Sequence, residues 1–522
     1  MKINNLTVQV YENEEKLVFD FCSMYLKKIY KTTVETVDPD TSKVSKQPAF
    51  ETEYFYTVKE TENGNMLEFR KGLLFFVLNQ LDSYNYTYKR ELQFNPDTIC
   101  TDLSKLKSTR ETLLEGITLK EKQWEAITAV IQNKGGVFQA GTGFGKTYCL
   151  ASIIKALNEI NGRALTVLLI APTLKISKQI FASLKKTKAG KIANWKDYKY
   201  IAKGKINIAC TSSIINSVKR NPELLKDVEV FMEDECHHSG SNSNILIYDN
   251  LKNTTLFFGV SASYVEQKRL GDLHFQNYYI SELRAIQCLG PVVWDCPAKD
   301  LIEMNQLCKP VLQVIRRQVK EGLPRGGERN WVLIQRNILM SKGRTQVIIN
   351  AIKYYLSKGL NVCCLVNNHN WARKIAIGLE NPSIVGLLFG SEVSEVVSSD
   401  GKKTRVTTQN LYKQFEAGRR KVIIGTNVLF EGVDIPVIQV LINCISGRNE
   451  KRVIQMVGRG LRLHQSKKEV VIVDIKDEGN AILEKQYRRR LEVYRDSIGI
   501  DINKEILYLK ESELTSDDRE NL

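Results

Sequence analysis

Residues 139–147 read Gln-Ala-Gly-Thr-Gly-Phe-Gly-Lys-Thr and decide which fold we expect around them. The apolar stretch 136–139 leads into them and is typical of a buried strand, whereas residues 146–160 have the apolar spacing of a helix. Glycines between a strand and a helix let successive backbone N–H groups turn towards phosphate oxygens, and the helix start adds partial positive charge. The stretch therefore predicts a loop that binds the phosphates of a nucleotide.

Two side chains at the end of this loop supply the chemistry that phosphates need. Lys146 is expected to neutralise the β- and γ-phosphates of ATP, and the Thr147 hydroxyl is expected to bind Mg²⁺. The cradle itself would consist of Gly141, Thr142, Gly143 and Gly145. The strict motif has glycine where this chain has Ala140, so a glycine-rich turn without chemistry is the alternative. The strand and helix on either side favour the phosphate loop.

From about residue 113 the chain alternates between short apolar runs and helical segments, which favours parallel sheets covered by helices. The runs lie at 136–139, 165–170, 206–210, 228–232 and 256–260 and, after a polar stretch at 321–329, at 361–366, 421–424, 437–442 and 470–473. The sequence therefore predicts an α/β protein with two tandem parallel-sheet domains. The expected boundaries are 1–112 for a small α+β domain, 113–295, a connector over 296–330, and 331–522 with a closing basic helix.

An acidic segment follows the apolar run 228–232. Asp234 and Glu235 stand at the end of this predicted strand, at the carboxyl edge where open α/β sheets bind ligands. We expect Asp234 to hold Mg²⁺ through water and Glu235 to polarise the water that attacks the terminal phosphate. Two adjacent acids also occur in solvated turns. A metal site on Cys-His-His at 236–238 is a further alternative, which lacks a second ligand cluster.

Another charged motif lies in the later α/β domain, where residues 455–462 read Gln-Met-Val-Gly-Arg-Gly-Leu-Arg. Arg459 and Arg462 are three residues apart, a spacing that places them on one helix face. Guanidinium groups stabilise the charge that develops during phosphoryl transfer, and we expect both arginines to act on nucleotide bound by the first α/β domain. A solvated basic helix is the alternative for this motif taken alone.

Together and in this order, the motifs resemble those of superfamily 2 helicases of the DExH type. The matching segments are Gln123, 139–147, 171–174, 211–213, Asp-Glu-Cys-His at 234–237, Ser-Ala-Ser at 261–263, 425–436 and 455–462. The resemblance covers residues 113–495 and implies two RecA-like motor domains that hydrolyse ATP with Mg²⁺.

The resemblance also implies roles for individual residues. Nucleotide contacts would come from Gln123, which reads adenine, and from Gly432 and Asp434, the latter near the ribose. Contacts to strand phosphates would come from Thr173, Thr211, Ser212 and Thr426. Coupling between hydrolysis and domain movement would involve His237, Ser261 and Ser263, and Gln455 would join the two arginines in catalysis.

Within the superfamily the chain is most similar to the phage UvsW-like group, which is related to RecG and XPB. The shared features are the second histidine after the DExH box, the phrase at 453–462 and the tail Gln-Tyr-Arg-Arg-Arg-Leu at 486–491. This similarity implies remodelling of branched DNA, such as forks, Holliday junctions and displacement loops, in a bacterial host cytoplasm. An RNA helicase, a restriction or defence motor and a nucleotide-gated binding module remain alternatives.

The charge distribution favours a polyanionic partner on the two α/β domains. Lys and Arg number 75 against 59 Asp and Glu, a net charge of +16, whereas residues 1–112 carry 15 basic and 17 acidic side chains. We therefore expect the first domain to position a branch, and aromatic side chains there could stack on exposed bases, unless they line the core of the domain or a strand face. The candidate side chains are Lys71, Tyr84, Tyr86, Tyr88, Lys89 and Arg90. A lysine-rich run at 185–205 is either a solvated loop or a phosphate-tracking surface. No apolar run of membrane-spanning length occurs, and we expect a cytoplasmic monomer.

Overall fold

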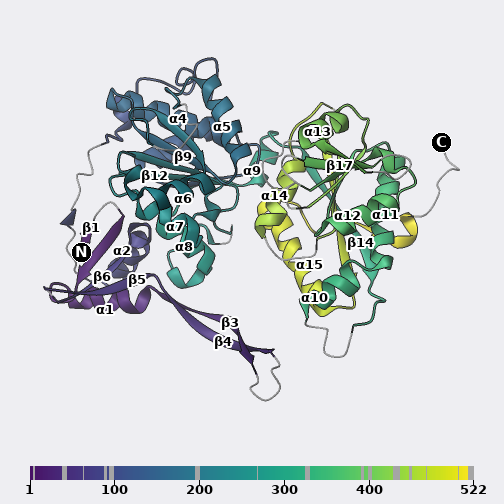
Figure 1. The fold of residues 1–522 in the computed structure, drawn as a ribbon, viewed down its shortest axis with the longest axis horizontal. Helices are drawn as coiled ribbons and strands as arrows, with labels where there is room; N and C mark the ends of the chain where they lie inside the picture. The colour runs from purple at the N-terminus through teal and green to yellow at the C-terminus, as the bar shows by residue number, and fades with distance from the viewer. Residues whose placement is uncertain are drawn as a thin grey trace. The chain divides into compact units, whose positions relative to one another are not determined.

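The computed structural model describes residues 1–3, 6–37, 44–62, 64–86, 91–92, 99–193, 200–266, 269–323, 330–389, 393–397, 403–426, 435–445, 450–465, 467–503 and 505–514. The chain divides into two compact units (Figure 1). One comprises Met1–Gln139 and Gly145–Asp295, and the other comprises Ala140–Phe144 and Cys296–Leu522. Among the described residues, no helix has the length and apolar character needed to cross a membrane.

A small mixed domain opens the first unit (Figure 1). Its five-stranded sheet has the order β5-β6-β2-β1-β7, with β1 at Lys2–Ile3, β2 at Thr7–Tyr11, β5 at Tyr56–Thr61, β6 at Gly64–Arg70 and β7 at Glu91–Leu92. Its helices are α1, Lys16–Tyr25, and α2, Leu74–Ser83. Alternate residues of β2, Val8 and Val10, are buried, as expected for a strand with one covered face.

A long antiparallel hairpin extends from this small domain (Figure 1). Strand β3, Lys27–Val37, pairs with β4, Val44–Tyr54, over 11 residues of each strand. Near its base Arg284, on α8 (Ile280–Leu289), donates from Nη2 to Oε2 of Glu53 at 3.0 Å. The foot of the hairpin is therefore tied to the α/β domain that follows.

The first α/β domain contains a six-stranded sheet of order β10-β9-β11-β12-β8-β13. The strands are β8 Gly136–Ala140, β9 Val167–Ala171, β10 Ile206–Cys210, β11 Val230–Asp234, β12 Leu256–Ser261 and β13 Val292–Cys296. The helices are α3 Glu121–Gln132, α4 Lys146–Asn161, α5 Leu174–Thr187, α6 Thr211–Arg220, α7 Asn242–Asp249 and α8. The strands from β10 to β8 pair in parallel, so their carboxyl ends share one edge.

The small domain and the first α/β domain share one hydrophobic core. Buried side chains of both, among them Phe76 and Phe231, belong to a single apolar cluster. Gly72 approaches α8 so closely that a Cβ at this position would clash with the carbonyl oxygen of Ile286. A residue without a side chain is therefore required at this contact.

The second unit is built on a nine-stranded sheet of order β18-β17-β16-β19-β15-β20-β21-β14-β22. The strands are β14 Lys309–Gln318, β15 Val362–Leu365, β16 Val385–Leu388, β17 Val393–Val397, β18 Lys403–Thr407, β19 Val422–Gly425, β20 Val440–Asn443, β21 Glu469–Glu478 and β22 Ile506–Lys510. The helices are α9 Ala298–Glu303, α10 Trp331–Ile334, α11 Lys342–Ser357, α12 His369–Ile377, α13 Thr408–Glu416, α14 Glu450–Gly460 and α15 Ala481–Val493. Strands β16 to β22 pair in parallel, and β17 and β18 add an antiparallel edge.

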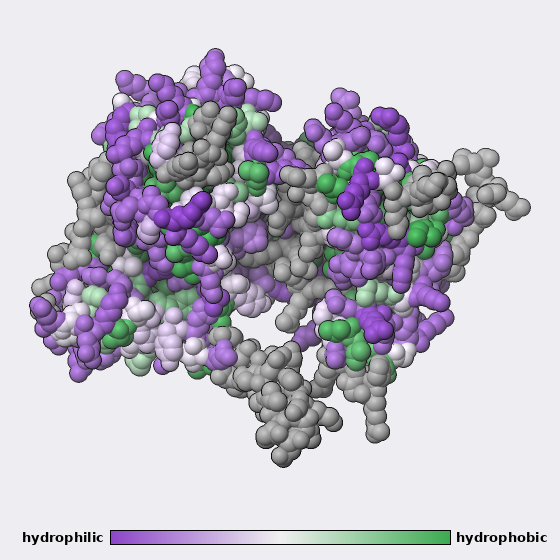
Figure 2. All heavy atoms as spheres, viewed as in Figure 1, coloured by the Kyte–Doolittle hydropathy of each residue, from purple (hydrophilic) through white to green (hydrophobic). Residues whose placement is uncertain are grey.

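The predicted fold class, two tandem parallel-sheet domains after a small α+β domain, is confirmed. The face of the molecule in Figure 2 is mostly hydrophilic, with small apolar patches. Many of the apolar residues lie inside the two sheets, because all the residues of β8, β9, β15 and β19 are buried.

Strand β14 lies in the segment for which the sequence predicts a connector. It pairs with β21 along its whole length, from Lys309 opposite Glu469 to Gln318 opposite Glu478. Its charged residues lie at its two ends, on either side of the mostly apolar stretch 310–315, which the sequence analysis missed. One of them, the buried Arg317, donates from Nη1 to Oδ1 of Asp477 at 3.0 Å, and a buried charge is tolerated when it is paired in this way.

Candidate functional site

The predicted phosphate loop lies between β8 and α4, at the carboxyl edge of the six-stranded sheet. Gly143 and Gly145 have φ angles of +93° and +91°, a left-handed conformation that side chains disfavour. The Gly141 N–H donates to the carbonyl oxygen of Cys296, at the end of β13, at 3.0 Å. Lys146 and Thr147 are the first residues of α4, and both are half-buried.

Gln123 lies directly against this loop. Its Oε1 accepts the backbone N–H of Lys120 at 2.9 Å and so caps the start of α3. A Cβ at Gly145 would lie 2.5 Å from Nε2 of Gln123, so the amide group borders the glycine backbone. The structure thus brings Gln123 to the loop that ends in Lys146, although 23 residues separate the two in sequence.

The acidic segment lies at the same sheet edge. Asp234 is the last residue of β11 and is half-buried. Glu235 follows with a φ angle of +53°, a left-handed conformation that costs a non-glycine residue on the order of 1–3 kcal/mol. Such strain persists where neighbouring contacts fix the backbone, and it turns the chain sharply after the strand.

His237 connects this acidic segment to the end of β12. Its Nδ1 lies 3.4 Å from Oε2 of Glu235 and 2.9 Å from the hydroxyl oxygen of Ser261. The same hydroxyl oxygen accepts the backbone N–H of Ser263 at 3.2 Å. The three residues predicted to couple hydrolysis to movement, His237, Ser261 and Ser263, therefore form one continuous set of contacts with Glu235.

Glu233 belongs to this region and was missed by the sequence analysis. It precedes Asp234 on β11, so its side chain points to the opposite face of the sheet. The carboxylate accepts hydrogen bonds from the Tyr248 hydroxyl and, at 2.7 Å, from the Ser239 hydroxyl. Burial raises the pKa of Glu233 to about 7, although these hydrogen bonds act in the opposite direction. A third consecutive acid beside Asp234 and Glu235 was the available signal.

The candidate strand-binding residues gather at the ends of β9 and β10. Ala171 and Cys210, the last residues of these strands, are opposite each other in the sheet. Thr211 donates from Oγ1 to the Ala171 carbonyl oxygen at 3.1 Å, and Thr173 caps α5 by accepting the Ile176 N–H. Ser212, which is exposed, follows Thr211 at the start of α6. Thr173, Thr211 and Ser212 therefore share the sheet edge with the phosphate loop and Asp234.

Helix α14 of the second unit carries part of the arginine motif. Gln455 is buried, and Arg459 is half-buried in the last turn. The helix ends at Gly460, so Arg462 follows it and does not continue the same helix face, which corrects our expectation for this pair. The glycines at 458 and 460 disfavour extension of the helix.

The remaining candidate residues of the second unit lie at or near β19. Thr426 directly follows this strand, and its N–H donates to the Leu388 carbonyl oxygen at 3.3 Å. Gly432 and Asp434 lie outside the described residues.

Two oxygen-bearing side chains near the phosphate loop have the chemistry that Mg²⁺ requires. This ion is usually bound through one or two protein oxygens together with water and substrate phosphates. The Thr147 hydroxyl and the Asp234 carboxylate offer oxygen atoms at one sheet edge. Within the described part of the chain, no group of three or more His, Cys, Asp or Glu residues is placed to hold a metal.

Two family models match the chain. The model described as "Type III restriction enzyme, res subunit" matches residues 116–265, and "Helicase conserved C-terminal domain" matches residues 349–464. The first match contains the phosphate loop, the acidic segment and the strand ends. The second contains the arginine motif.

Curated and solved relatives agree with these matches. A candidate ATP-dependent helicase of Saccharomyces cerevisiae, IRC3, is 23% identical over 379 residues, which are 68% of this chain and 51% of that protein. The matched region thus spans about half the length of that relative. A fragment structure of a candidate HsdR subunit of a type I restriction enzyme from Vibrio vulnificus is 15% identical, covers 95% and 83% of the two chains and has a TM-score of 0.54. A structure of a single-substitution variant of S. cerevisiae Dbp5 bound to RNA and ADP BeF3 is 16% identical, covers 80% and 97%, and has a TM-score of 0.50.

Proposed function

We propose that this chain, which carries the two conserved domains of a superfamily 2 helicase, is an ATP-driven helicase or translocase that unwinds or remodels branched DNA. The paired domain matches and the helicase-named relatives support an ATP-dependent nucleic-acid helicase. One observation carries the proposal. The phosphate loop, Asp234 and the residues at the ends of β9 and β10 all meet at the carboxyl edge of one parallel sheet.

In the proposed reaction the loop glycines and Lys146 hold the phosphates of ATP, and Gln123 contacts the adenine. Mg²⁺, when bound by Thr147 and Asp234, would neutralise charge on the phosphate oxygens. Glu235 orients the attacking water and accepts its proton. Arg459 and Arg462, with Gln455, stabilise the negative charge that develops on the transferred phosphoryl group, and Asp434 contacts the ribose.

The contacts between Glu235, His237 and Ser261 suggest how hydrolysis alters the grip on a strand. When Glu235 releases its water, the hydrogen bond between His237 and Ser261 has to readjust. The Ser263 hydroxyl could form a hydrogen bond after this readjustment, because it is buried and has no hydrogen-bond partner among the described residues. A changed end of β12 would shift β11, its neighbour in the sheet, and through β11 the ends of β9 and β10. Thr173, Thr211 and Ser212 would contact strand phosphates at those ends. Thr426 makes the corresponding contact from the second domain.

Branched DNA is the finer part of the proposal. Phosphate contacts carry no sequence information, so the motor would act on many sequences. The small domain is the part best suited to recognise a branch, because its hairpin extends from the sheet and is tied at its foot by Arg284 and Glu53. Tyr84 is 64% exposed and remains a stacking candidate, whereas Tyr86 packs at the edge of the core.

Two alternatives follow from the relatives. The Dbp5 structure contains RNA, and the first family model and the Vibrio relative come from restriction enzymes. The deciding experiment measures ATP hydrolysis and strand separation on single-stranded DNA, duplex, fork, four-way junction and RNA, with Lys146→Ala as the inactive control. We expect the strongest stimulation and strand separation with forks or four-way junctions. Preference for RNA would favour an RNA helicase, and hydrolysis on duplex without strand separation would favour a restriction-type translocase.

A further inference from the structure

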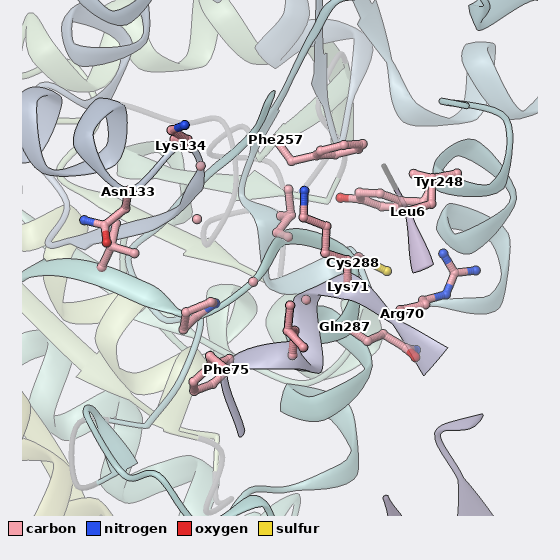
Figure 3. Close-up of a pocket in the computed structure, with 18 of the residues that line it drawn as sticks. Leu6, Arg70, Lys71, Phe75, Asn133, Lys134, Tyr248, Phe257, Gln287 and Cys288 are labelled. Atoms are coloured by element: carbon pink, nitrogen blue, oxygen red, sulfur yellow. The ribbon is translucent and has the colours of Figure 1, made fainter. Parts of the chain in front are cut away.

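A pocket of about 310 Å³ lies where the small domain meets the first α/β domain (Figure 3). The small domain contributes the turn from β6 to α2, with Arg70 and Lys71. The α/β domain contributes the loop around Lys134, the start of β8 at Gly136, and Phe257 at the start of β12. These are the amino ends of the strands, so the pocket is at the opposite edge of the sheet from the phosphate loop and is a separate site.

The walls of this pocket combine an apolar surface with positive charge. Leu74, Phe75, Leu78 and Phe257 are among its apolar residues. Among the described residues that line it, three are basic and none is an aspartate or a glutamate. Figure 3 shows the Lys71 side chain pointing into the pocket toward Phe257.

The three basic side chains differ in their surroundings. Arg70 forms an ion pair with Asp249, which lies outside the pocket. Burial lowers the pKa of Lys71, and the positive charge of Lys134 lowers it further. An anion between Lys71 and Lys134 would favour the charged form of both amines, because a nearby opposite charge raises the pKa of an amine.

From this combination of shape and charge we propose that the pocket binds a small organic anion with an aromatic or aliphatic body. Its volume falls at the lower end of the range of small-molecule sites, roughly 300–1,000 Å³, which suits a body of one or two rings. The anionic group would lie between Lys71 and Lys134. The apolar body would lie against Leu74, Leu78 and Phe257.

The test uses the full-length protein and 8-anilinonaphthalene-1-sulfonate, a fluorescent anion with an aromatic body. Its neutral counterpart, N-phenyl-1-naphthylamine, serves as the matched probe without charge. We expect saturable binding of one sulfonate per chain. Lys71→Met should weaken it by roughly tenfold, the usual effect of losing one charge-assisted hydrogen bond in a partly buried site. Lys134→Gln should weaken it less, and Lys71→Arg should retain it.

Two controls keep the outcome decisive. Lys226→Met removes an exposed lysine of the same domain that does not line the pocket, and it should leave the affinity unchanged. Thermal unfolding establishes that each variant is folded, with Lys134→Gln as the second variant if Lys71→Met is not. Equal affinity of the folded Lys71→Met protein and the unaltered protein, or equal binding of the neutral and anionic probes, would overturn the proposal.

Discussion

The Nδ1 atom of His237 lies 2.9 Å from the hydroxyl oxygen of Ser261. This hydrogen bond joins the turn after β11 to the end of β12, two strands that are neighbours in the sheet. Glu235 also contacts His237, since its carboxylate lies 3.4 Å from the same nitrogen. A change at the proposed water-activating residue therefore has a direct route of two contacts to the adjacent strand.

We predict that His237→Ala separates ATP hydrolysis from strand movement. The substitution removes the link to Ser261 and leaves Lys146 and Asp234 in place, so hydrolysis should stay within a few-fold of the unaltered protein. Strand separation per ATP should fall roughly fivefold, measured by parallel hydrolysis and unwinding assays, as expected for loss of about 1 kcal/mol of hydrogen bonding between strands. His369→Ala is the control, because His369 is exposed on α12 of the second unit and has no contact with His237 among the described residues. Equal losses of hydrolysis and unwinding in His237→Ala would contradict the coupling role.

Substitutions in the phosphate loop and the acidic segment should separate binding from chemistry. Lys146→Ala removes a principal phosphate cation, so ATP binding should weaken and hydrolysis should fall on the order of 10²–10³-fold. Glu235→Gln keeps the shape of the side chain and the Mg²⁺ ligand Asp234, so the protein should still bind ATP but not turn it over. Equilibrium binding of a fluorescent ATP analogue and steady-state hydrolysis measure the two effects. Near-normal turnover by folded Glu235→Gln would show that the acids are wrongly assigned.

Replacement of the arginines should reduce kcat more than ATP affinity. Arg459→Ala and Arg462→Ala each remove positive charge that matters mainly in the transition state, and a loss on the order of 10³-fold in kcat is expected by analogy with measured arginine fingers. Arg488→Ala, which changes an exposed arginine on α15, controls for net charge. The decisive quantity is the ratio of the change in kcat to the change in affinity. A change in affinity alone would argue for a role in ground-state binding.

The raised pKa of Glu233 predicts a pH-dependent stability. The pKa of this carboxyl group is about 7 in the folded protein and near 4.5 in the unfolded chain. The stabilising contribution of Glu233 to the free energy of unfolding is therefore complete below pH 4.5. It is lost as the pH rises through about 7, because the buried carboxyl group then has to ionise at a cost in free energy. As the pH rises from 5 to 8, the free energy of unfolding should decrease less in Glu233→Gln than in the unaltered protein, because glutamine does not ionise. Thermal unfolding across that range measures the difference between the two proteins, which should grow with pH. A constant difference would show that Glu233 does not titrate there.

The lysine-rich run makes a prediction about salt. Lys188 and Lys203 form exposed ion pairs with Glu115 and Asp227, and Lys196 and Lys199 lie outside the described residues. Conversion of Lys185, Lys186, Lys191 and Lys205 to Gln tests the others. If they contact DNA phosphates, the slope of log affinity against log salt should become shallower by up to about 0.9 per lost contact. A charge-matched control converts Lys155, Lys219, Lys226 and Lys252, and identical slopes in both variants would identify the run as a solvated surface.

Much of the motor fold follows from local patterns in the sequence. Buried parallel strands are continuously apolar, so β9 and β15 are visible in the sequence, and a glycine-rich turn between strand and helix marks the phosphate loop. The acidic pair at the end of β11 is predictable for the same reason, because strand direction fixes the edge at which it lies. These features depend on residues close together in the chain.

Other features depend on partners that are far apart in the chain. The buried charge of Arg317 near the end of β14 is explained only when its partner Asp477, 160 residues later, is known. Glu233 looks like one more surface acid until Tyr248 and Ser239 enclose it. Helix α14 ends at Gly460, before Arg462. The spacing of three residues between Arg459 and Arg462 does not determine where the helix ends. Tertiary contacts, not local propensity, decide each of these cases.

The shared core described for the small domain has a consequence during synthesis of the protein. Residues up to Tyr86 leave the ribosome before the α/β domain, yet the apolar side chains that cover them include Phe275 and Leu289. At about 5–20 residues per second, roughly 200 further residues take about 10–40 s to be made. During that interval Phe76 and its neighbours are exposed on a nascent chain and are available to chaperones or to aggregation. The small domain thus precedes the α/β domain in sequence but completes its folding only once that domain has been made.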